Sequence, residues 1–165
     1  MPDIVALGLS FWPHPKLELA VDGVLVMWST YDVTKIRLKD GTPMDQEHNY
    51  KNSWVARLGV EWDSPLQGLV VRGGVIYDQS PAPSNRLEPT LPDADQIDFT
   101  AGIGYSWEWL TLDLAYQLAW FLPAEAEGGV VGPEGTYDTL AHMFGLGATV
   151  RFDWDARDEA ASVAE

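Results

Sequence analysis

The fold is decided by one stretch in the C-terminal half of the chain, Leu110-Thr111-Leu112-Asp113-Leu114-Ala115-Tyr116-Gln117-Leu118-Ala119-Trp120-Phe121. Its large apolar residues recur at every second position, which places them on one side of an extended strand. Polar residues such as Asp113 and Gln117 fall on the other side. The stretch therefore predicts a β-strand with one apolar and one polar face.

The same period of two appears in six further runs: residues 4–12, 17–38 (the regular part ending near residue 28), 54–62, 69–78, 97–107 and 140–152. Their connections alternate between tight turns, such as 13–16 and 63–68, and longer polar loops at 39–51, 79–95 and 122–138. Short turns at one end and long loops at the other are typical of outer-membrane β-barrels. We therefore expect an all-β antiparallel meander of about seven strands.

Composition narrows the classes of function. The 165 residues include 10 Lys and Arg against 25 Asp and Glu, and the resulting net charge of −15 would repel a nucleic-acid backbone. The absence of cysteine excludes disulfides, thiolate metal sites and a cysteine nucleophile. No run approaches the roughly 18 apolar residues of a membrane helix. The first residues do not resemble a signal peptide, which leaves either a cytoplasmic chain or one whose true N-terminus is missing.

The two faces of the predicted strands differ in charge. One face has 39 positions without a single Asp, Glu, Lys or Arg, whereas the other carries charged residues and glycines. So many apolar side chains would overfill a small barrel. Aromatic residues also gather at both strand ends, as they do at two membrane interfaces. We therefore expect the apolar face to meet lipid. The alternatives are a soluble lipid-binding β-sandwich or calyx, and a purely structural outer-membrane barrel.

Four motifs follow one another in a specific order: Arg72-Gly73-Gly74-Val75-Ile76-Tyr77-Asp78-Gln79-Ser80-Pro81, Pro89-Thr90-Leu91-Pro92-Asp93-Ala94-Asp95, Gly102-Ile103-Gly104-Tyr105 and Leu112-Asp113-Leu114-Ala115-Tyr116. This order resembles the FadL-type outer-membrane transporters of long-chain fatty acids and aromatic hydrocarbons. The resemblance implies strands eight to fourteen, the C-terminal half, of a 14-stranded transmembrane β-barrel in the cell outer membrane. It implies a barrel segment over residues 1–154, followed by an acidic tail at 155–165 that we expect to be disordered.

Strand parity points the same way. A complete single-chain bacterial barrel has an even number of strands with both termini on the periplasmic side. Seven strands would leave the termini on opposite sides, so we expect a truncated chain. Its first and last strands would then be unpaired edges, through which we expect self-association.

Two sets of residues on the polar face are candidate functional residues. The first set is charged and clusters toward the short turns: Glu18, Asp22, Arg57, Glu61, Arg72, Asp113 and Arg151. We interpret it as a lumen network of ion pairs, with a polar constriction as the alternative. The second set is apolar and lies toward the long loops: Val26, Trp28, Val55, Ile76, Phe121 and Met143. It predicts a substrate-binding pocket for an alkyl chain or aromatic ring. The alternative is that these residues pack against each other or against the N-terminal hatch that, as the resemblance implies, plugs the barrels of this family.

Catalysis has little support in the sequence. The three histidines lie in a turn (His14), in an acidic loop (His48) and on the apolar face (His142). No serine or carboxylate lies on the same face and at the same height in the barrel as His142, so a catalytic triad has no support. Acidic loop residues do not match a calcium-binding spacing, so we expect no metal and no cofactor. The expected partners are a hydrophobic small molecule and outer-membrane lipid, and the expected function is passive uptake of hydrophobic solutes.

Overall fold

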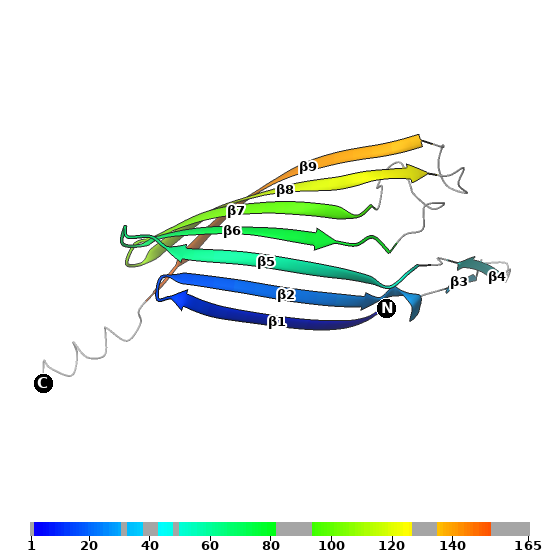
Figure 1. Ribbon diagram of the computed structural model, residues 1–165, viewed down its shortest axis with the longest axis horizontal. Coiled ribbons are helices and arrows are strands. Elements are labelled where there is room, and N and C mark those ends of the chain that lie inside the picture. The colour runs from blue at the N-terminus through cyan, green and yellow to red at the C-terminus, as the bar shows by residue number, and fades with distance from the viewer. Residues whose placement is uncertain are drawn as a thin grey trace, which may run out of the picture.

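The protein is a single curved layer of antiparallel strands (Figure 1). This computed structural model describes residues 2–30, 33–37, 43–47, 50–81, 94–126 and 135–152. Seven strands pair in the order β1-β2-β5-β6-β7-β8-β9. Their bounds are β1 Asp3–His14, β2 Leu17–Met27, β5 Ser53–Asp63, β6 Leu69–Asp78, β7 Gln96–Ser106, β8 Leu110–Ala126 and β9 Gly135–Val150. The predicted all-β meander of seven strands is confirmed.

The connection between β2 and β5 contains structure that the periodicity does not show. β2 ends at Met27 and a 3-10 turn, Trp28–Thr30, follows it, whereas the sequence pattern carries this strand toward residue 38. A separate two-stranded hairpin follows: β3 (Val33–Arg37) lies in the irregular end of the predicted run 17–38, and β4 (Pro43–Glu47) lies in the predicted loop 39–51. The charged and polar residues of the hairpin do not alternate with apolar ones, so no period of two predicts it.

The last two sheet strands are longer than predicted. β8 continues to Ala126 and β9 begins at Gly135, where the sequence pattern predicts a loop over 122–138. Pro123 has no N–H to donate and would interrupt a regular ladder. The register accordingly shifts between Phe121 and Ala124, and pairing resumes with Ala124 opposite Tyr137. The bulge lets the ladder continue past a residue that normally ends one.

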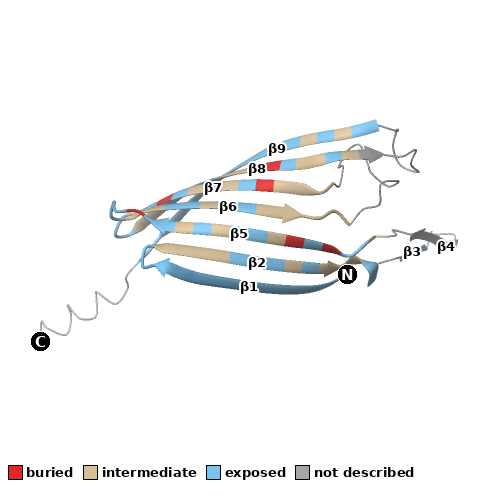
Figure 2. Ribbon diagram, in the orientation of Figure 1, coloured by how far each residue is buried: buried red, intermediate tan, exposed pale blue. Residues whose placement is uncertain are grey.

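Burial in this sheet is inverted relative to that of a water-soluble protein. In the five interior strands, every large hydrophobic residue that is exposed belongs to the predicted apolar face; Leu58 (59% exposed) and Leu114 (48%) are examples. The buried strand residues lie on the other face and include Val55, Ala119 and Asp98 (Figure 2). The sheet therefore shelters its polar face and presents its apolar face outward.

The short turns are hydrogen-bonded to one another along one end of the sheet, which we call the short-turn end. The Ser106 N–H donates to the Gly68 carbonyl oxygen at 2.8 Å, and the Arg151 N–H donates to the Trp109 carbonyl oxygen at 2.8 Å. Gly68 has a φ of 84°, and a Cβ there would collide with the carbonyl oxygen of Ser106. This rim fixes the ends of the strands that carry the polar-face charges.

Both outer strands of the sheet lack a second neighbour among the described residues. β1 pairs only with β2 and β9 only with β8, and all twelve residues of β1 are exposed. β1 and β9 run in the same direction, because an odd number of strands lies between them and each strand is antiparallel to the next. The predicted edge strands are confirmed.

We expect the purified 165-residue chain to be insoluble without detergent and to oligomerise in detergent. Exposed apolar edge strands aggregate, and the apolar face adds a large uncharged surface. Size-exclusion chromatography with light scattering, with and without detergent, tests this. A monodisperse, detergent-free monomer would contradict it.

Candidate functional site: the polar face of the sheet

Cross-strand register decides which polar-face residues meet. Asp22 in β2 lies opposite Arg57 in β5, and Glu61 in β5 lies opposite Arg72 in β6. Arg72 in turn lies opposite Gly102 in β7; we call such a line of opposed residues across the sheet a row. Because alternate residues share a face, the ladders gather charged side chains from neighbouring strands near the short-turn end.

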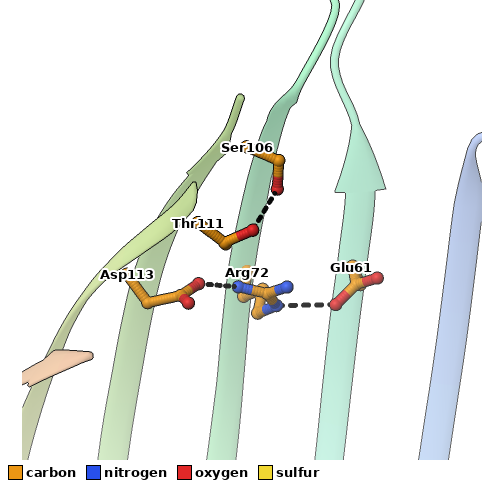
Figure 3. Close-up of polar contacts among 5 residues, drawn as sticks. All are labelled: Glu61, Arg72, Ser106, Thr111 and Asp113. Atoms are coloured by element: carbon orange, nitrogen blue, oxygen red, sulfur yellow. Dashed lines mark hydrogen bonds and ion pairs between the residues drawn. The ribbon is translucent and has the colours of Figure 1, made fainter. Parts of the chain in front are cut away.

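Arg72 is the centre of a chain of ion pairs (Figure 3). Its Nε donates to Glu61 Oε2 at 2.6 Å, and its Nη1 donates to Asp113 Oδ1 at 2.9 Å. A second pair joins Arg57 Nη1 to Asp22 Oδ1 at 3.1 Å. The side chains in these pairs are 38–46% exposed, so each pair contributes only about 0–1 kcal/mol. Their main effect is to fix the positions of the charges.

The pair between Arg72 and Asp113 joins β6 to β8 and so crosses β7, which lies between them. It crosses at Gly104. A Cβ on Gly104 would lie 2.5 Å from Asp113 Oδ1 and 3.0 Å from Arg72 Nη1. Glycine at this position therefore leaves the space that the ion pair occupies.

Two members of the predicted charged network remain outside the ion pairs. Glu18 lies opposite Glu61, a like charge, and Arg151 follows the end of β9. Neither side chain forms an ion pair within the part of the chain that the structure describes. The structure thus joins five of the seven predicted residues: one pair, Asp22 with Arg57, and one triplet centred on Arg72.

Asp98 in β7 is a buried carboxyl group on the same face. The residue is 3% exposed, and its Oδ2 accepts a hydrogen bond from Gln117 Nε2 at 2.7 Å. Its Oδ1 has no hydrogen-bond partner among the described residues. A buried carboxyl group with an unpartnered oxygen is costly, so Asp98 is a strained polar group on this face.

A hollow of about 400 Å³ lies on the polar face across β6, β7, β8 and β9. Arg72, Thr100 and Gln117 give it hydrogen-bonding groups, and Ala115 and Met143 give it apolar surface. A second hollow of about 500 Å³ lies on the apolar face, where Leu112, Leu114 and other residues of the uncharged set line it. The polar-face hollow is the better candidate for a solute because it combines both kinds of lining.

The six predicted pocket residues do not occupy one row of the sheet. Val55 and Phe121 lie in the same row, which runs through Asp78 and Gln96 between them. Ile76 is one row nearer the short-turn end, opposite Arg57 and Asp98, and Met143 is one row further, opposite Gln117. Of the six, Met143 lines the polar-face hollow.

The two remaining pocket residues lie at the long-loop end of β2. Val26 is opposite Ser53, which is buried. Trp28 is in the 3-10 turn beyond the strand, where its ring meets Tyr50 edge-on with centroids 5.8 Å apart. A pocket formed by the six residues stays a prediction.

The base of the loop between β6 and β7 is held by Asp95, which the sequence analysis interprets only as one of the solvated acidic loop residues. Its Oδ2 accepts a hydrogen bond from the Tyr77 hydroxyl at 2.7 Å, and its Oδ1 accepts one from the Ser80 N–H at 2.9 Å. The Tyr77 ring also stacks on Trp54, with centroids 4.9 Å apart. The available signal was the motif order itself, because Tyr77, Ser80 and Asp95 all belong to the two adjacent motifs.

Few of the described residues could bind a metal ion or take part in catalysis. The described residues hold no group of three or more His, Asp or Glu that could bind a metal ion. His142 Nδ1 lies 2.9 Å from the Tyr116 hydroxyl on the apolar face. No helix within the described ranges is long and apolar enough to cross a membrane. His48 and the acidic tail lie outside the described residues.

Comparisons with known proteins agree with this architecture. A family model described as "Outer membrane protein transport protein (OMPP1/FadL/TodX)" matches residues 1–152. The crystal structure of a Pseudomonas aeruginosa FadL homologue superposes with a TM-score of 0.76 at 23% sequence identity, covering 90% of this chain and 35% of that one. No curated protein matches the sequence. Because the family model covers residues 1–152, the chain belongs to the FadL family of outer-membrane transport proteins.

Proposed function

We propose that the chain forms the C-terminal half of a barrel that admits hydrophobic solutes, long-chain fatty acids or aromatic hydrocarbons, passively across the outer membrane. The observation that supports this most is the inverted burial, with uncharged side chains outward and a hollow on the sheltered face. In this proposal residues 1–154 are the barrel segment and residues 155–165 an appended tail. The chain spans 35% of the FadL homologue's length, so the remaining wall would come from other strands.

The proposed route follows the polar face from the long-loop end toward the short-turn end. Apolar residues near the long loops, such as Val55 and Phe121, would capture the solute, and the hollow beside Met143 would hold it next. The chain of ion pairs at Arg72 lies on the short-turn side of that hollow and would narrow the route. No step needs an energy source, because the solute moves down its own gradient.

Replacing Phe121 with Ala should weaken binding of a fluorescent long-chain fatty acid by about 1–3 kcal/mol, the usual effect of losing a buried apolar side chain. Phe121 lies on the polar face, half-buried. Its neighbour Trp120 is 43% exposed on the apolar face, so Trp120→Ala should change stability and leave affinity unchanged. Parallel titrations of the two variants with one probe measure both effects. A larger loss of affinity in Trp120→Ala, or no loss in either, would refute the proposed route.

A further inference from the structure

The cation that lines the polar-face hollow is already neutralised. Arg72 carries one positive charge, and it donates to two carboxylates, Glu61 at 2.6 Å and Asp113 at 2.9 Å. The triplet therefore has a net charge of −1 (one positive and two negative groups). An anion that enters the hollow meets a guanidinium whose field is cancelled by its own partners.

The glycine of β7 that lies opposite Asp113 makes this arrangement possible. Gly104 leaves the space through which Asp113 reaches Arg72, and a Cβ there would lie 2.5 Å from Asp113 Oδ1. A Cβ on Gly147, on the other side of β8, would lie 3.5 Å from the Asp113 Cβ, an ordinary contact. Asp113 therefore reaches Arg72 across β7 because Gly104 has no side chain.

A third carboxyl group lies close to the same hollow. Gln117, which lines the hollow, donates to Asp98, which forms no ion pair within the described part of the chain. Three carboxyl groups (Glu61, Asp98 and Asp113) and one guanidinium therefore surround this part of the polar face. The local field is negative and opposes a negatively charged solute.

The hollow nevertheless has uncharged hydrogen-bonding groups. The Thr100 hydroxyl and the Gln117 amide line it, beside the apolar surface of Ala115 and Met143. Such a lining suits an apolar body with a small neutral head that can donate or accept hydrogen bonds.

We propose that this hollow binds neutral amphiphiles, such as long-chain alcohols or phenols, in preference to the carboxylate of the same chain length. The inference rests on the proposed function, since it assumes that solute occupies the polar face. The triplet's net charge of about −1 within several ångströms, in a partly hydrated site, corresponds to roughly a fivefold preference for the neutral head.

The test uses two photoactivatable diazirine probes of equal length, dodecan-1-ol and dodecanoate, at pH 8, where the carboxylate is ionised. The 165-residue chain is refolded in maltoside micelles, labelled, and digested for mass spectrometry of the peptides that contain Gln117 and Met143. We expect about fivefold stronger labelling of these peptides by the alcohol.

Asp113→Asn is the decisive variant, because it removes one of the two charges that cancel Arg72. The ratio of carboxylate to alcohol labelling should rise about fivefold. Asp22→Asn is the matched control. Asp22 also forms an ion pair on the polar face and is also 38% exposed, but its partner Arg57 does not line the hollow, so the ratio should stay unchanged. Glu61→Gln, which removes the other charge, repeats the test if Asp113→Asn does not fold.

The outcomes separate the two levels of the proposal. If neither probe labels the hollow peptides, solute does not occupy the polar face and the proposed function fails. If both probes label them equally and neither Asp113→Asn nor Glu61→Gln changes the ratio, the preference for neutral solutes is wrong while the binding face stands. An equal rise in Asp22→Asn would also overturn it, because the effect would then come from general surface charge.

Discussion

Replacing Leu114 with Arg is expected to block membrane assembly of the chain. Leu114 lies in β8 on the apolar face, is 48% exposed and lines the hollow on that face. An arginine near the bilayer midplane on the lipid side of a barrel costs about 2–4 kcal/mol. Heat-modifiable migration on gels after refolding into bilayers should show the folded band lost or strongly reduced.

The matched control is Gln117→Arg, three residues along the same strand but on the polar face. Gln117 donates to Asp98 Oδ2, and an arginine there would still have a carboxyl group to pair with. This variant should fold with little change. Equal folding yields for the two variants would mean that the faces have been assigned the wrong way round.

Replacing Asp95 with Ala should destabilise the folded chain by about 1.5–3 kcal/mol, the scale of hydrogen bonds to a charged group. The substitution removes the acceptors of both the Tyr77 hydroxyl and the Ser80 N–H, and so opens the base of the β6–β7 loop. Urea titration of the folded fraction in bilayers measures the change.

Asp63→Ala is the comparison for this experiment. Asp63 is an exposed carboxyl at the end of β5, where its backbone N–H, which a substitution keeps, donates to the Lys16 carbonyl oxygen. A surface change of this kind should stay within about 0.5 kcal/mol. If Asp95→Ala proves as mild as Asp63→Ala, the carboxyl group does not hold the loop.

The strands and their faces were predictable because they depend on a local property. A period of two is visible in any short window, as in the β8 stretch from Leu110 to Phe121, and it fixes which side chains share a face. The β3–β4 hairpin and the continuation past Pro123 were not predictable in this way. The first has no alternating pattern, and the second depends on a bulge that the partner strand β9 accommodates.

The ion-pair partners of individual charged residues were harder to predict from the sequence. That Arg72 and Asp113 share a face follows from alternation, but their contact requires a strand between them that has no side chain at the crossing point. Gly104 provides that crossing, and it becomes meaningful only when the register of three strands is known. Asp95 was missed for a related reason, because its contacts join the two ends of a loop, where no periodicity applies.

Because the apolar face points outward, contact between this face and the bilayer contributes to the free energy of folding. The interior strands β5, β6 and β7 contain 11, 10 and 11 residues. At about 3.3 Å per residue and a tilt of about 45°, such strands span about 25 Å. The apolar side chains of these strands are therefore matched to a hydrocarbon layer of that thickness. In a thicker membrane the turns at Gly68 and Trp109 would be drawn toward hydrocarbon, and in a thinner one Trp54 and Trp62, near the ends of β5, would meet water. Hydrophobic thickness is therefore one of the conditions that set the stability of this sheet.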